Sequence, residues 1–221
     1  MKVSEINKLI RKHLERSLSD YSVHRDLIFK IESDFFIKGY DFESRGNEDM
    51  DLSVWCFVQP LFVKSDCLYY TFGGRLTYKR KINLLQSKEM DWWDARKENL
   101  DDSFQSILQS ILKDGEKYLN SIASVEDFYK KFNSEKKDNL RIYESVAYST
   151  ILFAEEDLQN KLLKGLIKET ENESIEWIRQ IGEDATLLLN AETSSNRMEI
   201  LKSWANETIA HLKLSQVKPF V

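Results

Sequence analysis

Two apolar and aromatic runs, separated by a short polar segment, constrain the fold of this chain more than any other feature. The first runs from Val54 to Val63 and the second from Leu68 to Leu76. Runs of β-branched and aromatic residues are typical of strands, and the polar segment Lys64-Ser65-Asp66 between them is typical of a turn. The sequence therefore predicts a long β-hairpin.

The register of this hairpin decides the state of the two cysteines. A turn centred on Ser65 places Cys56 opposite Gly74 and Cys67 opposite Val63, so the two cysteines do not face each other. No export signal is recognised, and disulfides belong to oxidising compartments. We therefore expect two reduced, buried thiols.

Other strands are expected from alternating patterns before the hairpin. Residues Leu27 to Ile31 and Phe36 to Phe42 alternate in this way. From Leu52 to Phe62, apolar residues stand at both even- and odd-numbered positions, so both faces of this strand should be apolar. This pattern predicts a strand that is covered on both faces. Pro60 has no backbone N–H to donate to a neighbouring strand, so it belongs at a bulge or on an unpaired side of the strand. The expected sheet is antiparallel and has about four strands.

Helical spacing dominates outside the sheet. An amphipathic helix is expected from Val3 to Leu14, and another from Phe104 to Leu112 that stops near Gly115. Ser124 and Asp127 form a capping box that opens a further helix. The polar run 133–139 is the best linker candidate. Four more helices are expected, namely Tyr143–Ala154, Leu158–Ile167, Ile175–Leu189 and Arg197–Leu214.

These elements together predict an α+β protein with an N-terminal helix, a sheet of about four antiparallel strands and a helical C-terminal half. The expected domains are an α+β sheet domain at 1–132 and a helical bundle or helical-hairpin region at 140–214. We expect the second to pack on the first as one compact unit.

Composition limits the classes of partner. The 221 residues carry 32 Lys and Arg against 37 Asp and Glu, a net charge of −5 with a pI near 5.4. An acidic chain does not attract phosphate backbones over long distances, so nucleic acid is not an expected partner. No stretch approaches the roughly 20 apolar residues that span a bilayer, so no membrane partner is expected either. The prediction is a cytoplasmic protein.

Patterns for catalysis and metal binding are missing from the sequence. His13, His24 and His211 are far apart, and neither a His-Glu-x-x-His nor a paired Cys-x-x-Cys occurs. No nucleophile elbow is present. We predict no catalytic residues, no metal ligands and no cofactor.

A glycine pair before a basic segment invites an anion-binding hypothesis. Gly73 and Gly74 would let backbone N–H groups approach an anion, and Arg75, Lys79 and Arg80 would neutralise it. The pattern matches neither a Walker loop nor Gly-x-Gly-x-x-Gly. A glycine pair at a strand end more often marks a bulge or close backbone packing, and this structural interpretation is favoured.

Paired indoles flanked by carboxylates form the second candidate site. In Asp91-Trp92-Trp93-Asp94 the rings would suit a stacking platform, although a role in the core is the favoured alternative. With the acidic loop residues Glu48, Asp49 and Asp51, Trp92 and Trp93 would make an interaction surface. Trp177 and Trp204 are interpreted as anchors between helices.

The order of several short motifs resembles an uncharacterised bacterial protein family, a domain of unknown function. The motifs are Tyr40-Asp41-Phe42-Glu43-Ser44, Val58-Gln59-Pro60-Leu61-Phe62-Val63, Thr71-Phe72-Gly73-Gly74-Arg75-Leu76 and Glu144-Ser145-Val146-Ala147-Tyr148. A second, looser likeness to another such domain covers Phe42 to Phe132. These resemblances imply a leading helix, a few strands and a helical C-terminal half, and they carry over no activity or binding residue.

Two functional hypotheses follow from different classes. The favoured one is a non-enzymatic protein-interaction module, for example an immunity or defence protein that masks a basic partner; self-association is a third option. The alternative is a small-molecule or anion-binding protein, or an enzyme, that uses Arg75 and Arg80 beside Tyr69 or Tyr70 near the sheet.

Overall fold

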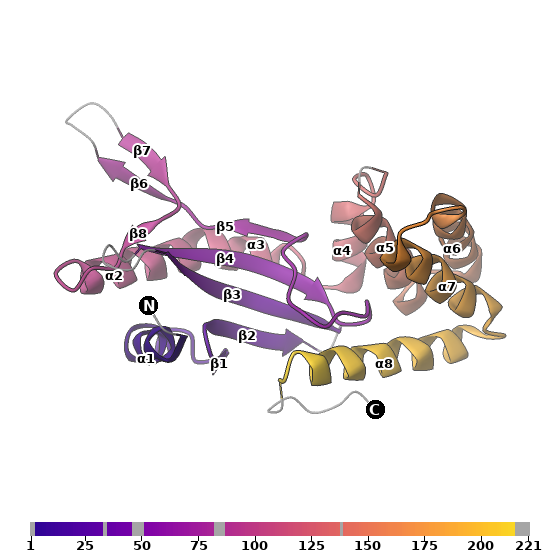
Figure 1. Ribbon diagram of the computed structural model, residues 1–221, viewed down its shortest axis with the longest axis horizontal. Coiled ribbons are helices and arrows are strands. Elements are labelled where there is room, and N and C mark those ends of the chain that lie inside the picture. Colours follow the sequence, from indigo (N-terminus) through magenta and orange to yellow (C-terminus); the bar gives the residue numbers. More distant parts are fainter. Residues whose placement is uncertain (1–2, 33–34, 46–50, 82–86, 138, 215–221) are drawn as a thin grey trace. The chain divides into compact units, whose positions relative to one another are not determined.

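The computed structural model describes residues 3–32, 35–45, 51–81, 87–137 and 139–214. It is an α+β protein with an N-terminal helix, an antiparallel sheet and a helical C-terminal half, as predicted (Figure 1). The chain separates into two compact units, one made of 1–59 and 69–121 and the other of 60–68 and 122–221. We call them the sheet unit and the helical unit. This division differs from the expected ranges 1–132 and 140–214, and the packing of the two parts as one unit stays a prediction.

The main sheet follows the order β1-β2-β3-β4-β5, and β8 also pairs with β4. In the described part of the chain it therefore has six strands, because the short strands β1 and β8 join those that the sequence pattern predicts. The bounds are β1 Ser22–His24, β2 Leu27–Glu32, β3 Phe36–Arg45, β4 Asp51–Pro60, β5 Gly73–Arg75 and β8 Trp93–Asp94.

The predicted hairpin register is confirmed where the strands pair. Cys56 lies opposite Gly74, and Trp55 lies opposite Arg75. The second strand is shorter than expected, because the ladder covers only Gly73–Arg75. The intervening residues 60–68 belong to the helical unit, where Lys64 forms an ion pair with Asp184. In this segment, contacts within the helical unit thus take the place of the expected ladder pairing.

Neither cysteine forms a disulfide, but only one is buried. Cys56 is 3% exposed, and burial raises the pKa of its thiol. Cys67 is exposed, so the expectation of a second buried thiol was wrong. Its segment leaves the sheet before the second strand begins.

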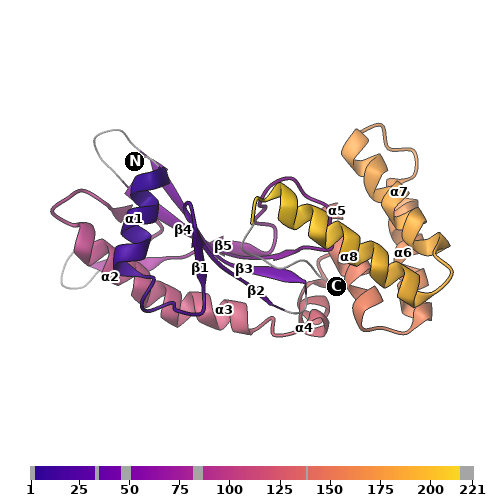
Figure 2. The ribbon, with the colours of Figure 1, turned by 90° about the horizontal axis from the view of Figure 1, so that it is seen from below.

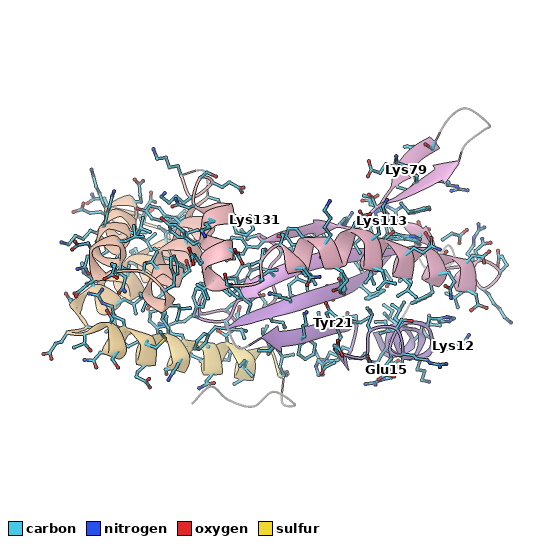
Figure 3. All side chains as sticks on the ribbon, turned by 180° about the vertical axis from the view of Figure 1, so that it is seen from behind. Lys12, Glu15, Tyr21, Lys79, Lys113 and Lys131 are labelled. Carbon is cyan, nitrogen blue, oxygen red and sulfur yellow. The ribbon has the colours of Figure 1, made fainter. Side chains whose placement is uncertain are left out.

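Helices cover one face of the sheet (Figure 3). They are α2 Leu100–Ser110, the π-helix η1 Ile111–Gly115 and α3 Glu116–Asn120, which follow one another without a break. Phe104 stacks on Phe42 of β3, and the indole N–H of Trp93 donates to Ser106 Oγ at 3.0 Å. Helix α1 Val3–His13 buries Ile6 and Ile10, and its His13 ring stacks on Phe104.

The helix that was expected to stop near Gly115 continues through it. The wider π turn passes this residue with a hydrogen bond from Glu116 N–H to the Ile111 carbonyl. A Cβ on Gly115 would lie 2.6 Å from Cε1 of Tyr40, so glycine is needed here for close packing rather than for helix termination. The next residue, Glu116, accepts hydrogen bonds from the hydroxyls of Tyr21 and Tyr40 at 2.6 and 2.9 Å.

A two-stranded ribbon of β6 Tyr78–Lys81 and β7 Ser87–Met90 leaves the sheet unit beside β5 and β8 (Figure 1). Lys79 lies opposite Glu89 in its register. The foot of the ribbon is fixed to the sheet unit because the Tyr78 ring stacks on Trp93, 4.9 Å between centroids, and its hydroxyl donates to the Trp92 carbonyl.

The helical unit contains five α-helices in the described part (Figure 2). Their bounds are α4 Val125–Phe132, α5 Leu140–Ser149, α6 Glu156–Thr170, α7 Glu176–Asn190 and α8 Ser194–His211, with a 3₁₀ turn η2 at Thr150–Leu152. The predicted capping box is confirmed. The Ser124 side chain accepts a hydrogen bond from the Asp127 backbone N–H, and the Asp127 carboxylate accepts one from the Ser124 backbone N–H. No helix among the residues described here is long and apolar enough to cross a bilayer.

One of the two predicted tryptophan anchors is confirmed. Trp204 is 5% exposed and packs 5.6 Å from the ring of Tyr148. Trp177 is 50% exposed, so its assignment as an inter-helix anchor was wrong. It lies in the first turn of α7, and the Arg141 guanidinium, 5.8 Å from its ring centroid, is its cationic neighbour.

Candidate functional site

The candidate site lies at the end of β3, where one side of the strand is open. Tyr40 and Phe42 point into the core, whereas the alternate residues Asp41, Glu43 and Arg45 are partly or fully exposed. Successive side chains on a strand point to opposite faces, so the last three share the face that α2, η1 and α3 do not cover. We call the cluster around them the aromatic–acidic face, which comprises Asp41, Glu43, Arg45, Asp51, Trp55, Tyr70, Arg75, Asp91 and Trp92.

Arg75 is the centre of this cluster. Its guanidinium lies 5.0 Å from the ring centroid of Trp55 and 4.9 Å from that of Trp92. It forms ion pairs with Glu43 at 2.7 Å and with Asp91 at 3.3 Å. One guanidinium thus contacts two aromatic rings and two carboxylates, which are both groups that bind arginine favourably.

A second arginine extends the same arrangement. The Arg45 guanidinium lies 4.0 Å from the Trp92 ring centroid and pairs with Asp51 at 3.1 Å. The Trp92 ring therefore has two cationic neighbours, Arg45 and Arg75. The Trp55 indole N–H also donates to Glu43 at 3.3 Å.

Asp41 and Tyr70 form the other end of the face. The Tyr70 hydroxyl donates to the Asp41 carboxylate, and its ring stacks on Trp55 at 5.0 Å between centroids. Burial raises the pKa of Asp41 to about 6, against the opposing effect of the Tyr70 hydrogen bond. Burial also raises the pKa of the Tyr70 phenol, which stays a donor at neutral pH. Asp41 thus changes charge close to the physiological range.

The face carries more negative than positive charge. Asp41, Glu43, Asp51 and Asp91 are its acids, and Arg45 and Arg75 are its bases, which leaves −2 when all are ionised. The side chains of Glu43 and Asp91 remain 46% and 43% exposed despite their ion pairs. They can accept further hydrogen bonds from a ligand.

A pocket of about 540 Å³ lies beside this face, within the sheet unit. We call it the ribbon-foot pocket, because β6, β7, α2 and η1 form its walls. It is lined by Arg75, Leu76, Thr77, Tyr78, Lys79, Glu89, Ser106, Gln109, Ser110, Lys113 and Asp114.

The structure places the predicted anion-binding residues in two different surroundings. Arg75 lines the pocket but has Glu43 and Asp91 as counter-ions, so its charge is compensated. Lys79 lines the pocket as well, whereas Arg80 is exposed on β6 and is not among the lining residues. The expected clamp of Arg75 with Arg80 is therefore not formed at this pocket. Tyr70 contacts the Arg75 cluster through Trp55.

The structure brings together only some of the residues that were predicted to form an interaction surface. Trp92 and Asp51 belong to the aromatic–acidic face. Trp93 is 1% exposed and part of the core, so its place on that surface was wrong; adjacent strand residues point to opposite faces, and its side receives α2. Glu48 and Asp49 lie outside the described residues.

Sequence reasoning missed Asp41, Glu43, Arg45 and Trp55 as site residues. The available signal was the alternation at the end of β3, where the charged residues 41, 43 and 45 are two positions apart and therefore lie on one face of the strand. Their meeting with Arg75 and Trp92 depends on strand pairing and on the path of the chain between β7 and β8.

Comparisons with known proteins give no family assignment. No protein-family model matches the chain, and neither the curated proteins nor the solved structures contain a match to it. In the part of the chain described here, no group of three or more His, Cys, Asp or Glu side chains is arranged to hold a metal ion. The aromatic–acidic face and the neighbouring pocket are therefore the features of this chain that bear on its function.

Proposed function

We propose that this chain is a non-enzymatic protein-interaction module whose aromatic–acidic face receives a basic segment of a partner protein. The observation that carries the proposal is the setting of Arg75, a guanidinium between Trp55 and Trp92 with Glu43 and Asp91 as counter-ions. A surface that holds its own arginine in this way has the chemistry to hold an arginine or lysine of a partner.

The charge of the face supports a basic partner over an acidic one. Its net charge of −2 has the same sign as the net charge of −5 of the whole chain. Complementary charge increases the rate of encounter and disfavours partners of the same sign. Each cation placed over an exposed aromatic ring contributes about 0.5–1 kcal/mol, so several contacts are needed for a stable complex.

The same proposal includes the broader expectations from the sequence. We place the protein in the cytoplasm of a bacterium, in the uncharacterised family that its motif order resembles. An immunity or defence protein that masks a basic partner is one concrete form of this function.

Binding of defined peptides tests the proposal. We expect an arginine-rich peptide of ten residues to bind the full chain and to change the fluorescence of the tryptophans, whereas a ten-residue glutamate peptide does not bind. The double variant Glu43→Gln/Asp91→Asn keeps the shape of both side chains and removes two charges, so it should weaken binding by about tenfold or more. The control Glu173→Gln/Glu183→Gln makes the same charge change on exposed residues of the helical unit and should leave binding unchanged.

The pH dependence of the same titration provides a second readout. Because the pKa of Asp41 is raised to about 6, its carboxylate loses its charge between pH 7 and pH 5. Peptide binding should weaken over this interval in the wild type, and less so in Asp41→Asn. Equal loss of binding in the site variant and in the control variant would refute the role of this face, as would the absence of any binding.

A further inference from the structure

We propose that the ribbon-foot pocket is a separate site for a small phosphomonoester that carries hydroxyl groups, such as a sugar phosphate. This pocket adjoins the partner surface at Arg75 and differs from it in the ligand that it would bind. Its volume of about 540 Å³ lies within the range of roughly 300–1,000 Å³ that is usual for small-molecule pockets.

The walls of the pocket are fixed by hydrogen bonds and ring contacts, so the cavity is part of the fold. Ser110 of α2 donates to the Thr77 carbonyl at 3.0 Å and links the helix to the chain that leads into β6. Ser106 accepts from the Trp93 indole, and Tyr78 stacks on the same indole. The helix wall and the ribbon wall thus share an anchor in Trp93.

Two lysines supply the positive charge. Lys79 comes from β6 and Lys113 from η1, and both lie at the foot of the ribbon (Figure 3). Neither forms an ion pair with another described residue. Glu89, the cross-strand neighbour of Lys79, instead accepts a hydrogen bond from the Thr77 hydroxyl at 2.6 Å. The charges of both lysines are therefore available to the oxygens of one phosphate group.

The pocket also contains acceptors, and its remaining cation, Arg75, is already paired with Glu43 and Asp91. Glu89 and Asp114 offer carboxylates, and Gln109 offers an amide that both donates and accepts. Carboxylates repel a second anionic group, but they accept hydrogen bonds from hydroxyls. A ligand with a single phosphate and several hydroxyls satisfies both sets of groups, whereas a ligand with two phosphates does not.

The backbone of the helix wall is an independent observation that points to a site. Lys113 and Asp114 lie within the π-helix Ile111–Gly115, the segment where the helix departs from regular α geometry. Such π turns are rare and frequently occur at functional sites. Here one cation and one acceptor of the π turn line the same pocket.

Calorimetric titration of the full chain tests this site. Glucose 6-phosphate, ribose 5-phosphate and glycerol 3-phosphate are the probes, and glucose and inorganic phosphate are the references. We expect saturable binding of at least one phosphomonoester with a Kd below about 1 mM. Inorganic phosphate should bind at least about tenfold more weakly, and glucose should give no signal.

Variants then locate the binding. Lys79→Ala/Lys113→Ala should abolish it, whereas Lys117→Ala, a change at an exposed lysine on the same helical segment and outside the pocket, should not. Thermal unfolding of both variants verifies that they fold. Three results would each overturn the proposal: no saturable binding of any of the three phosphomonoesters, equal binding of inorganic phosphate, or unchanged binding in the double-lysine variant.

Discussion

The Arg75 guanidinium lies 4.9 Å from the ring centroid of Trp92, although the sequence offers these residues as parts of two different sites. Arg75 was an anion-binding candidate and Trp92 an interaction candidate. The strand pairing of β5 with β4 and the path of the chain from β7 to β8 bring them together. With Glu43 and Asp91 as counter-ions, the arginine becomes part of a surface that suits cations better than anions.

Replacing Arg75 should destabilise the sheet unit. The variant Arg75→Ala removes two ion pairs and two ring contacts and leaves Glu43 and Asp91 without their cation. Since these groups are partly exposed, we expect a loss of about 1–2 kcal/mol in the free energy of unfolding, measured by urea titration. Arg80→Ala at the exposed position on β6 should change it by less than about 0.5 kcal/mol. Equal effects of the two substitutions would contradict the role given to Arg75.

The two neighbouring glycines of β5 should differ strongly in how much a substitution destabilises the protein. A Cβ on Gly73 would lie 2.3 Å from the Cys56 carbonyl oxygen and 2.9 Å from the Phe57 Cα, which are backbone atoms that cannot turn away. A Cβ on Gly74 would have no atom within 4 Å. Gly73→Ala should therefore lower the free energy of unfolding by more than about 2 kcal/mol, and Gly74→Ala should change it by less than about 1 kcal/mol. Matched thermal and urea unfolding of the pair gives the comparison, and a tolerated Gly73→Ala would show that the strands can separate.

The stability of the helical unit should fall as the pH rises from about 4.5 to about 7. Glu144 is buried, and burial raises its pKa from 4.5 to about 7 in the folded state, with Asp184 adding to the effect and Arg141 opposing it. Between these values the folded chain binds more protons than the unfolded chain, so each rise in pH favours unfolding. The loss is complete above pH 7 and amounts to roughly 3 kcal/mol.

The variant Glu144→Gln isolates this contribution. It should be more stable than the wild type at pH 8 and similar to it near pH 4.5, as measured by hydrogen exchange of the α5 amides. Glu183→Gln, at an exposed position of α7, serves as the control for loss of a negative charge. Parallel pH profiles for the wild type and Glu144→Gln would argue against a titrating Glu144.

Lys64 should be the main anchor of segment 60–68 in the helical unit. Its ammonium lies 2.6 Å from Asp184 Oδ1 and 4.4 Å from the ring centroid of Trp204. Lys64→Met would remove the cation beside the buried Asp184 carboxylate, which would keep its hydrogen bond from the Gln180 amide at 3.1 Å. We expect this variant to lose about 2 kcal/mol or more in the free energy of unfolding. The double variant Lys64→Met/Asp184→Asn should recover part of this loss, because no unpaired charge remains. If the loss of unfolding free energy in the double variant equals the sum of the losses in the two single variants, the ion pair has no coupling energy.

Local patterns were sufficient to predict several elements of this fold. Alternation located β2 and β3, helical spacing located α1 and α5 to α8, and Ser124 with Asp127 identified the start of α4. The register of Cys56 against Gly74 followed from the turn residues alone. These features depend on side-chain periodicity and capping within a few residues, which a sequence displays directly.

Contacts between distant residues decided the rest. The segment after Pro60 could not be recognised as part of the helical unit, since its partners Asp184 and Thr208 follow more than a hundred residues later. Gly115 lies inside a continuous helix and is needed there because the Tyr40 ring occupies the space of a Cβ, a contact that the helix sequence alone does not show. The sequence by itself thus determined the class of the longer helices and strands and the hairpin register. Tertiary structure alone decided which charges meet at the candidate site, because ion pairs and ring contacts require proximity in space and leave no periodic trace along the chain.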